Sequence, residues 1–211
     1  MDVKFYCKDD LASKGISIAR FLELITAIDE ECGLIEEPYE VVVKKLIPVF
    51  DATEDMWRAI LINGEVKGYW NCVALDEKHQ MLLEQGRFLE SYVNVNNLKK
   101  DLFKEKNALL FDSVCLSPSC QNLKLSGHIY KSIYETLNAL PLKGIQVNEI
   151  WASIWSPEGI KFFSEGRHSW GFVPVVENIG NEGIEGHGYI YRVDFDEAMK
   201  KLESNIKKLK L

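Results

Sequence analysis

The segment Gln121-Asn122-Leu123-Lys124-Leu125-Ser126 is a short turn between an apolar run and an amphipathic stretch. It lies where many nucleotide-binding proteins have a row of glycines, although it contains none. The first turn of a helix presents unpaired N–H groups and about half a positive charge, which suits a pyrophosphate. Lys124 would add a mobile positive charge, and the Ser126 hydroxyl could cap the helix or donate to an anion. The alternative is an ordinary corner, with Ser126 as helix cap and Lys124 in solvent.

The elements that would position this turn form an α/β pattern. Apolar periodicity predicts helices over 17–32, from near 38 through 49, over 126–140, over 157–163 and, at the C-terminal end, over about 196–210. Pro48 places the last turn of the second helix in doubt. A short helix is also expected around 97–103. Strands are predicted over 3–7, 56–62, 66–74, 108–116, 150–154, 171–176 and 189–195, with Asn63-Gly64 as a hairpin turn. We therefore predict a single domain over 1–211, with an insertion at about 76–106 and a mixed, mostly antiparallel central sheet flanked by helices.

Two segments resemble motifs of the Gcn5-related N-acetyltransferase (GNAT) family, whose members use acetyl-CoA or another acyl-CoA. The family pattern V-x-P-x-x-[QR]-x-x-G-x-[GA] is similar to the chain from Leu116 to Ser126, where Leu116, Pro118 and Gln121 match. Lys124 and Ser126 stand in place of the two small residues. The later family motif, an aromatic pair followed by Gly-Phe, resembles Phe162-Phe163 with Gly171-Phe172.

The resemblance implies a splay between the strands near 110–116 and 150–154, where the acyl-CoA is held. It assigns CoA binding to the strand end and the following turn. The residues concerned are Val114, Cys115, Leu116, Gln121, Asn122, Leu123, Lys124, Leu125, Ser126 and Gly127. It implies acetyl transfer to an amine by direct attack, without a covalent intermediate. Cys115 and Cys120 are accordingly interpreted as structural.

Direct attack requires a base for the ammonium and an acid for the departing thiolate. Asp112 stands in an apolar strand, where a carboxylate lies either on a wet face or in a site, and it is the predicted base. Glu149 is a weaker candidate. The family's acid tyrosine corresponds to Phe163, which cannot donate a proton. Ser156, His168, Tyr189, Tyr191 or water could replace it, and Tyr191 is the predicted acid. The alternative role of either tyrosine is aromatic packing in the sheet.

A fold relative that binds CoA or a protein partner without turnover is the alternative function. Four glycines between 178 and 188 predict a loop that gates the acceptor pocket. Six acidic residues could attract a cationic acceptor or simply form a solvated helix face: Asp29, Glu30, Glu31, Glu36, Glu37 and Glu40. A homodimer through the C-terminal amphipathic helix is compatible with the sequence.

The overall charge and composition of the chain exclude some classes of binding partner. The formal net charge of −7 argues against nucleic acid or an anionic membrane as a partner. No run of 18 apolar residues and no signal peptide is apparent, which predicts a soluble cytoplasmic protein. Five cysteines without a CxxC pair indicate reduced thiols and no metal site.

Overall fold

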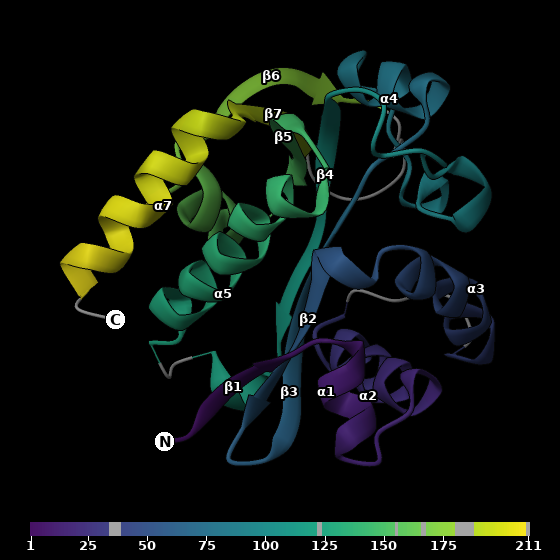
Figure 1. The fold of residues 1–211 in the computed structure, drawn as a ribbon, viewed down its shortest axis with the longest axis vertical. Helices are drawn as coiled ribbons and strands as arrows, with labels where there is room; N and C mark the ends of the chain where they lie inside the picture. The colour runs from purple at the N-terminus through teal and green to yellow at the C-terminus, as the bar shows by residue number, and fades with distance from the viewer. Residues whose placement is uncertain (34–38, 122–123, 155, 166–167, 180–187, 210–211) are drawn as a thin grey trace. The chain divides into compact units, whose positions relative to one another are not determined.

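The computed structural model describes residues 1–33, 39–121, 124–154, 156–165, 168–179 and 188–209 (Figure 1). The chain divides into two compact units. The first unit comprises Met1–Cys72 and Ser113–Leu125, and the second comprises Val73–Asp112 and Ser126–Leu211. The chain crosses between the units three times: near the end of one strand, after Cys72, within a second strand, after Asp112, and directly before the helix that starts at Ser126.

Hydrogen-bonded strands follow one another in the order β1-β2-β3-β4-β5-β7-β6, which makes a seven-stranded sheet. The β4–β5 pair is parallel, whereas β1–β2, β2–β3, β5–β7 and β6–β7 are antiparallel. The predicted fold class, a mixed and mostly antiparallel sheet flanked by helices, is confirmed. The strands are β1 (Val3–Tyr6), β2 (Trp57–Ile62), β3 (Glu65–Val73), β4 (Asn107–Leu116), β5 (Val147–Ile154), β6 (Val173–Asn178) and β7 (Gly188–Asp194).

Within the described residues, the α-helices of the first unit are α1 (Lys8–Ser13), α2 (Ile18–Glu31) and α3 (Tyr39–Ala52). Ser17 caps α2 as predicted, because its side chain accepts a hydrogen bond from the Arg20 N–H. The helix α1 is absent from the prediction. The doubt about Pro48 proves unfounded, since α3 continues past it to Ala52. Val49 and Phe50, directly after the proline, are fully buried, and this packing holds the last turn.

The β2–β3 hairpin confirms the prediction from Asn63-Gly64. Both turn residues have positive φ, 52° for Asn63 and 87° for Gly64, as a two-residue hairpin turn requires. Further along β3, Gly68 leaves room for the main chain of β4. A Cβ at this glycine would collide with the carbonyl oxygen of Cys115 and would lie 3.1 Å from the Leu116 Cα. The two strands therefore approach closely only because residue 68 has no side chain.

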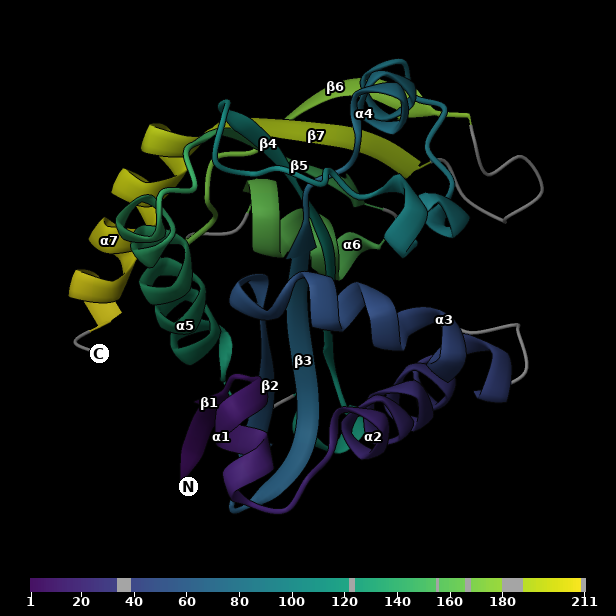
Figure 2. The ribbon, with the colours of Figure 1, turned by 45° about the vertical axis from the view of Figure 1, so that its right-hand side comes forward.

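The second unit holds α4 (Glu77–Glu84), α5 (Ser126–Ala139), α6 (Pro157–Ile160), the π-helical turn η6 (Lys161–Glu165) and α7 (Phe195–Leu209). The last helix lies beside α5, as both ribbon views show (Figures 1 and 2). It forms where the sequence predicts a C-terminal amphipathic helix. Single 3₁₀ turns complete the chain: η1 (Glu54–Met56), η2 (Glu90–Tyr92), η3 (Val95–Asn97), η4 (Pro118–Cys120) and η5 (Pro141–Lys143).

The predicted helix around 97–103 is wrong. The segment after η3 is extended instead, since Leu98 forms an antiparallel bridge with Leu75 and the Lys99 N–H donates to the Ala74 carbonyl at 2.9 Å. Leu98 is buried by this pairing. The helix of this region lies earlier, at α4, where Asp76 accepts a hydrogen bond from the His79 N–H and caps the first turn.

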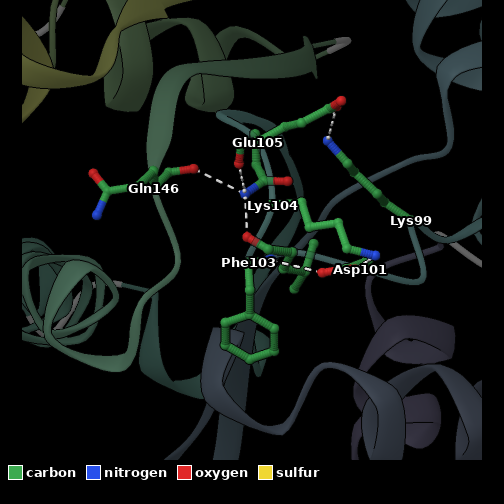
Figure 3. Close-up of polar contacts among 8 residues, drawn as sticks. Lys99, Asp101, Phe103, Lys104, Glu105 and Gln146 are labelled. Atoms are coloured by element: carbon green, nitrogen blue, oxygen red, sulfur yellow. Dashed lines mark hydrogen bonds and ion pairs between the residues drawn. The ribbon is translucent and has the colours of Figure 1, made fainter.

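Asn107 fixes the start of β4. Its side-chain Nδ2 donates to three main-chain carbonyls, those of Leu102 at 2.9 Å, Glu105 at 3.1 Å and Gln146 at 2.8 Å. Figure 3 shows this region, with the Lys99–Glu105 ion pair nearby. Asn107 is only 1% exposed. One buried amide thus joins the loop before β4 to the residue that precedes β5.

We expect Asn107→Asp to lower the free energy of unfolding by about 3 kcal/mol, because a carboxylate would face three carbonyl oxygens and lose every donor. Urea denaturation at neutral pH measures the change. Asn96→Asp is the matched control, since Asn96 is exposed and the change should cost less than about 0.5 kcal/mol. Equal effects of the two substitutions would show that the three hydrogen bonds do not hold the start of β4.

Candidate functional site

The central sheet splays where the parallel pairing between β4 and β5 stops. The register runs from Asn107↔Val147 to Phe111↔Ala152 and ends there. Beyond this pair β4 continues to Leu116, while β5 continues to Ile154 in register with β7. Within the described part of the chain, Asp112–Leu116 of β4 are therefore not paired with β5. The predicted splay near 110–116 and 150–154 is confirmed.

The end of β4 and the turn after it belong to the first unit. The Ser117 N–H donates to the Lys67 carbonyl of β3 at 2.8 Å. The Gln121 side chain folds back, and its Nε2 lies 3.4 Å from the Leu116 carbonyl oxygen. Cys115 and Leu125 are buried, Val114 and Leu116 are half-buried, and Gln121 and Lys124 are exposed. Gln121 thus helps to close the turn that follows β4.

Lys124 has a left-handed backbone, with φ 52°. This conformation costs about 1–2 kcal/mol for a residue with a Cβ, and glycine is the usual residue there. The resemblance aligns Lys124 with a family glycine, so the chain adopts a glycine-like conformation without the glycine. Such strain is found preferentially where a loop has a function to perform.

The helix α5 starts at Ser126 and runs for 14 residues. Ser126 is exposed at the first position, and Gly127 behind it is buried. Ser126 is therefore the first helical residue, and Leu125 occupies the position before it, where a capping residue would stand. This placement argues against Ser126 as the helix cap. The Ser126 hydroxyl lies instead in the first turn of the helix.

The two predicted catalytic residues, Asp112 and Tyr191, lie one row apart in the second unit. Tyr191 is paired with Ala152, which is itself paired with Phe111, the last β4 residue in the parallel ladder. Asp112 is the next residue along β4. Since β5 lies between the two strands, their backbones are about 10 Å apart. Because side chains alternate between the two faces along a strand, Asp112 projects from the opposite face of the sheet to Phe111, Ala152 and Tyr191, so the backbone pairing does not bring the two side chains together.

Tyr191 is buried, and burial raises the pKa of its hydroxyl, with a further increase from the Glu165 carboxylate. It therefore keeps its proton at neutral pH, as a general acid must. Glu149, the weaker candidate base, forms an ion pair instead: its carboxylate oxygen Oε2 lies 3.8 Å from the guanidinium nitrogen Nη1 of Arg192. The Arg192 guanidinium also lies over the Trp151 ring.

Phe163 is a core residue. Its ring packs against Phe111, Phe162, Trp170 and Phe172, with ring centroids 5.0–5.4 Å apart. It is 6% exposed. A tyrosine at position 163 would have its ring enclosed by this aromatic cluster. The position that resembles that of the family's acid is therefore poorly placed to donate a proton to a leaving thiolate.

Asp29 is a buried carboxylate that the sequence assigns only to a charged helix face. It is 6% exposed and accepts a hydrogen bond of 3.0 Å from the Tyr69 hydroxyl. The signal for its burial is its spacing, since it lies four residues after Ile25 and seven after Leu22 on the apolar stripe of α2. Glu30, Glu31 and Glu40 are exposed, as a solvated face requires.

Several predicted elements fall outside the described residues: Asn122, Leu123, Glu36, Glu37 and most of the glycine-rich segment up to 187. Within the described part of the chain, no group of three His, Cys, Asp or Glu side chains is arranged to hold a metal ion. In the same part, no helix has the length and hydropathy needed to cross a membrane.

No family model and no curated protein matches the sequence. Solved structures do match the fold. Ard1 from Thermoplasma volcanium aligns with a TM-score of 0.54 at 7% identity, over 92% of this chain and 96% of that one. An N-acetyltransferase from Staphylococcus aureus aligns with a TM-score of 0.53 at 12% identity, over 92% and 99%. The NatC complex bound to Gag peptide and CoA gives 0.54 at 11% identity, over 92% and 99%. The chain therefore has the GNAT fold.

Lys124→Gly should raise the free energy of unfolding by about 0.5–1 kcal/mol, because glycine relieves the left-handed strain and part of the gain is lost as backbone entropy. Lys124→Ala removes the same charge but keeps the Cβ, so it should change stability little. Chemical denaturation of both variants measures the difference. A glycine variant no more stable than the alanine variant would refute a positive φ at this position in solution.

Proposed function

We propose that this protein is an acyl-CoA-dependent N-acyltransferase that transfers an acetyl group from acetyl-CoA to an amine by direct attack. The observation that carries the proposal is the end of the β4–β5 ladder at Phe111↔Ala152, which leaves a strand edge at the place to which the resemblance assigns the acyl-CoA. An unpaired strand edge offers N–H and C=O groups that suit the amide-containing pantetheine arm.

The residues at the end of β4 and in the turn fit such a ligand. Val114, Cys115 and Leu116 would bind the pantetheine arm through their main chain. The pyrophosphate would lie at the start of α5, with the exposed Lys124 and the Ser126 hydroxyl as its side-chain partners. Gln121, Asn122, Leu123, Leu125 and Gly127 complete the proposed CoA segment. Bound acetyl-CoA would supply a thioester, which is the activated acyl group.

Asp112 is the proposed base and Tyr191 the proposed acid. A carboxylate at the splay can accept the proton of an attacking ammonium, and a protonated tyrosine can donate to the leaving thiolate. The acceptor is an amine of a small molecule or peptide.

Acetyl-CoA should raise the melting temperature of the protein, because a ligand bound only by the native state stabilises it by mass action. Lys124→Glu should weaken CoA binding at least tenfold, since it replaces attraction to the pyrophosphate by repulsion. Lys14→Glu is the control, an exposed lysine of the same unit. Isothermal titration measures both dissociation constants. No heat and no thermal shift at millimolar CoA would overturn the proposal.

Tyr191→Phe should lower kcat by about 10²-fold, the lower part of the range for general acid catalysis, and leave CoA affinity unchanged. Thiol release from acetyl-CoA measures kcat across a panel of amines. Tyr189→Phe is the matched control from the same strand, because Tyr189 is 41% exposed. A Tyr191→Phe variant with full kcat would exclude this hydroxyl as the acid.

A second candidate is a GNAT-fold protein that binds CoA or a protein partner without turnover. Phe163 favours it, because the position aligned with the family's acid lies inside an aromatic cluster. The same titration separates the two candidates. CoA binding with no thiol release from any amine of the panel supports the second, whereas sustained release with one amine excludes it.

A further inference from the structure

Cys32 and Cys115 bring their thiols into contact in the first unit. Cys32 is the residue that ends α2, and Cys115 lies near the end of β4. Their sulfur atoms are 3.7 Å apart, although 83 positions separate the two residues in the chain. This distance is close to van der Waals contact between two sulfurs, and a disulfide would bring the two atoms to about 2.05 Å.

The surroundings give the two thiols different accessibility. Cys32 is half-buried, whereas Cys115 is 7% exposed. The Cys32 thiol donates weakly to the Leu116 carbonyl at 3.6 Å, and the Gln121 Nε2 lies 3.9 Å from the same sulfur. An oxidant from solvent therefore reaches Cys32 first, and Cys115 is placed to resolve the product.

Asp29 lies beside the buried thiol. Burial raises the pKa of Cys115, and the Asp29 carboxylate raises it further. Cys115 is thus a poor nucleophile at rest, which protects it from reagents that act on thiolates. The same carboxylate can accept the Cys115 proton at the moment when the sulfur attacks a neighbouring disulfide.

The other cysteines have different environments. Cys7 forms a contact of 3.2 Å with the Asp10 carboxylate, the Cys120 sulfur lies 3.6 Å from the Ser119 hydroxyl, and Cys72 is fully buried in β3. The contact between Cys32 and Cys115 therefore predicts one preferred cross-link.

We propose that Cys32 and Cys115 form a reversible disulfide, a redox modification site that ties the end of α2 to the end of β4. The oxidant is a low-molecular-weight disulfide such as glutathione disulfide. The Cys32 sulfur attacks one sulfur of glutathione disulfide, which forms a mixed disulfide and releases one glutathione. The Cys115 sulfur then attacks the Cys32 sulfur, passes its proton to Asp29 and expels the second glutathione. Two electrons pass to glutathione disulfide, and the two thiol protons finish on two glutathione molecules.

The disulfide changes the end of β4 directly. The Leu116 carbonyl then loses the hydrogen bond from the Cys32 thiol. Of the two side-chain donors described above, Gln121 alone still contacts this carbonyl. It also closes a long loop, and such a cross-link stabilises chiefly by restricting the unfolded chain. The oxidised protein should consequently melt several degrees higher than the reduced protein.

The test is incubation of the full chain with glutathione disulfide, followed by alkylation of free thiols and non-reducing peptide mapping by mass spectrometry. We expect a peptide pair joined through Cys32 and Cys115, lost on reduction with dithiothreitol. Cys120→Ser, the control, should leave the cross-link unchanged. Cys115→Ser should instead retain glutathione on Cys32, because no thiol resolves the mixed disulfide.

Two results would overturn the proposal. One is wild-type protein that keeps glutathione on Cys32 at equilibrium with Cys115 still alkylated. The other is a cross-link distributed among several cysteine pairs, which would indicate unfolding rather than a prepared site. Because every readout concerns the thiols alone, the outcome does not depend on whether the protein binds CoA.

Discussion

The parallel pairing of β4 with β5, and its end at Phe111↔Ala152, is the constraint on which the functional part of the structure depends. Parallel neighbours cannot be joined by a tight turn, so the chain must leave β4, cross over and return to begin β5. The crossover consists of the turn after Leu116 and the helix α5. The N-terminus of α5 therefore follows the end of β4 that is not paired with β5 because of the parallel topology. No particular side chain is needed for this arrangement.

The same topology explains how the turn can lack the glycines of the GNAT pattern that it resembles. What the turn requires is a backbone path, and Lys124 takes the left-handed conformation that glycine adopts freely. The cost is about 1–2 kcal/mol. A lysine contributes a positive charge near the start of α5, which glycine does not. At the proposed CoA site, the positive charge of Lys124 would offset this local strain by attracting the pyrophosphate.

Much of the fold can be predicted from sequence where one local rule dominates. Asn63-Gly64 specifies the hairpin, Ser17 specifies the start of α2, and the C-terminal stripe specifies α7. Predictions failed where contacts between residues far apart in the sequence determine the local structure. Leu98 joins an isolated bridge with Leu75 instead of a helix, and burial of Val49 and Phe50 carries α3 past Pro48. The contact between Cys32 and Cys115, 83 positions apart, has no local signal at all.

The candidate site shows the same division between local pattern and long-range packing. The Pro118–Gln121 pattern locates the strand end and the turn, whereas the role of the aromatic pair depends on packing that the sequence does not display. Phe163 lies within a cluster with Phe111, and Phe111 is itself the last residue of the parallel ladder. The cluster therefore stabilises the strand at the very point where the sheet splays. A tyrosine at 163 would introduce a hydroxyl into that support and would need a buried partner. Support of the splay and donation of a proton place opposite demands on the ring at position 163, and we therefore assign the proposed proton donor to another element, to Tyr191 of β7, which lies in the same row as Phe111.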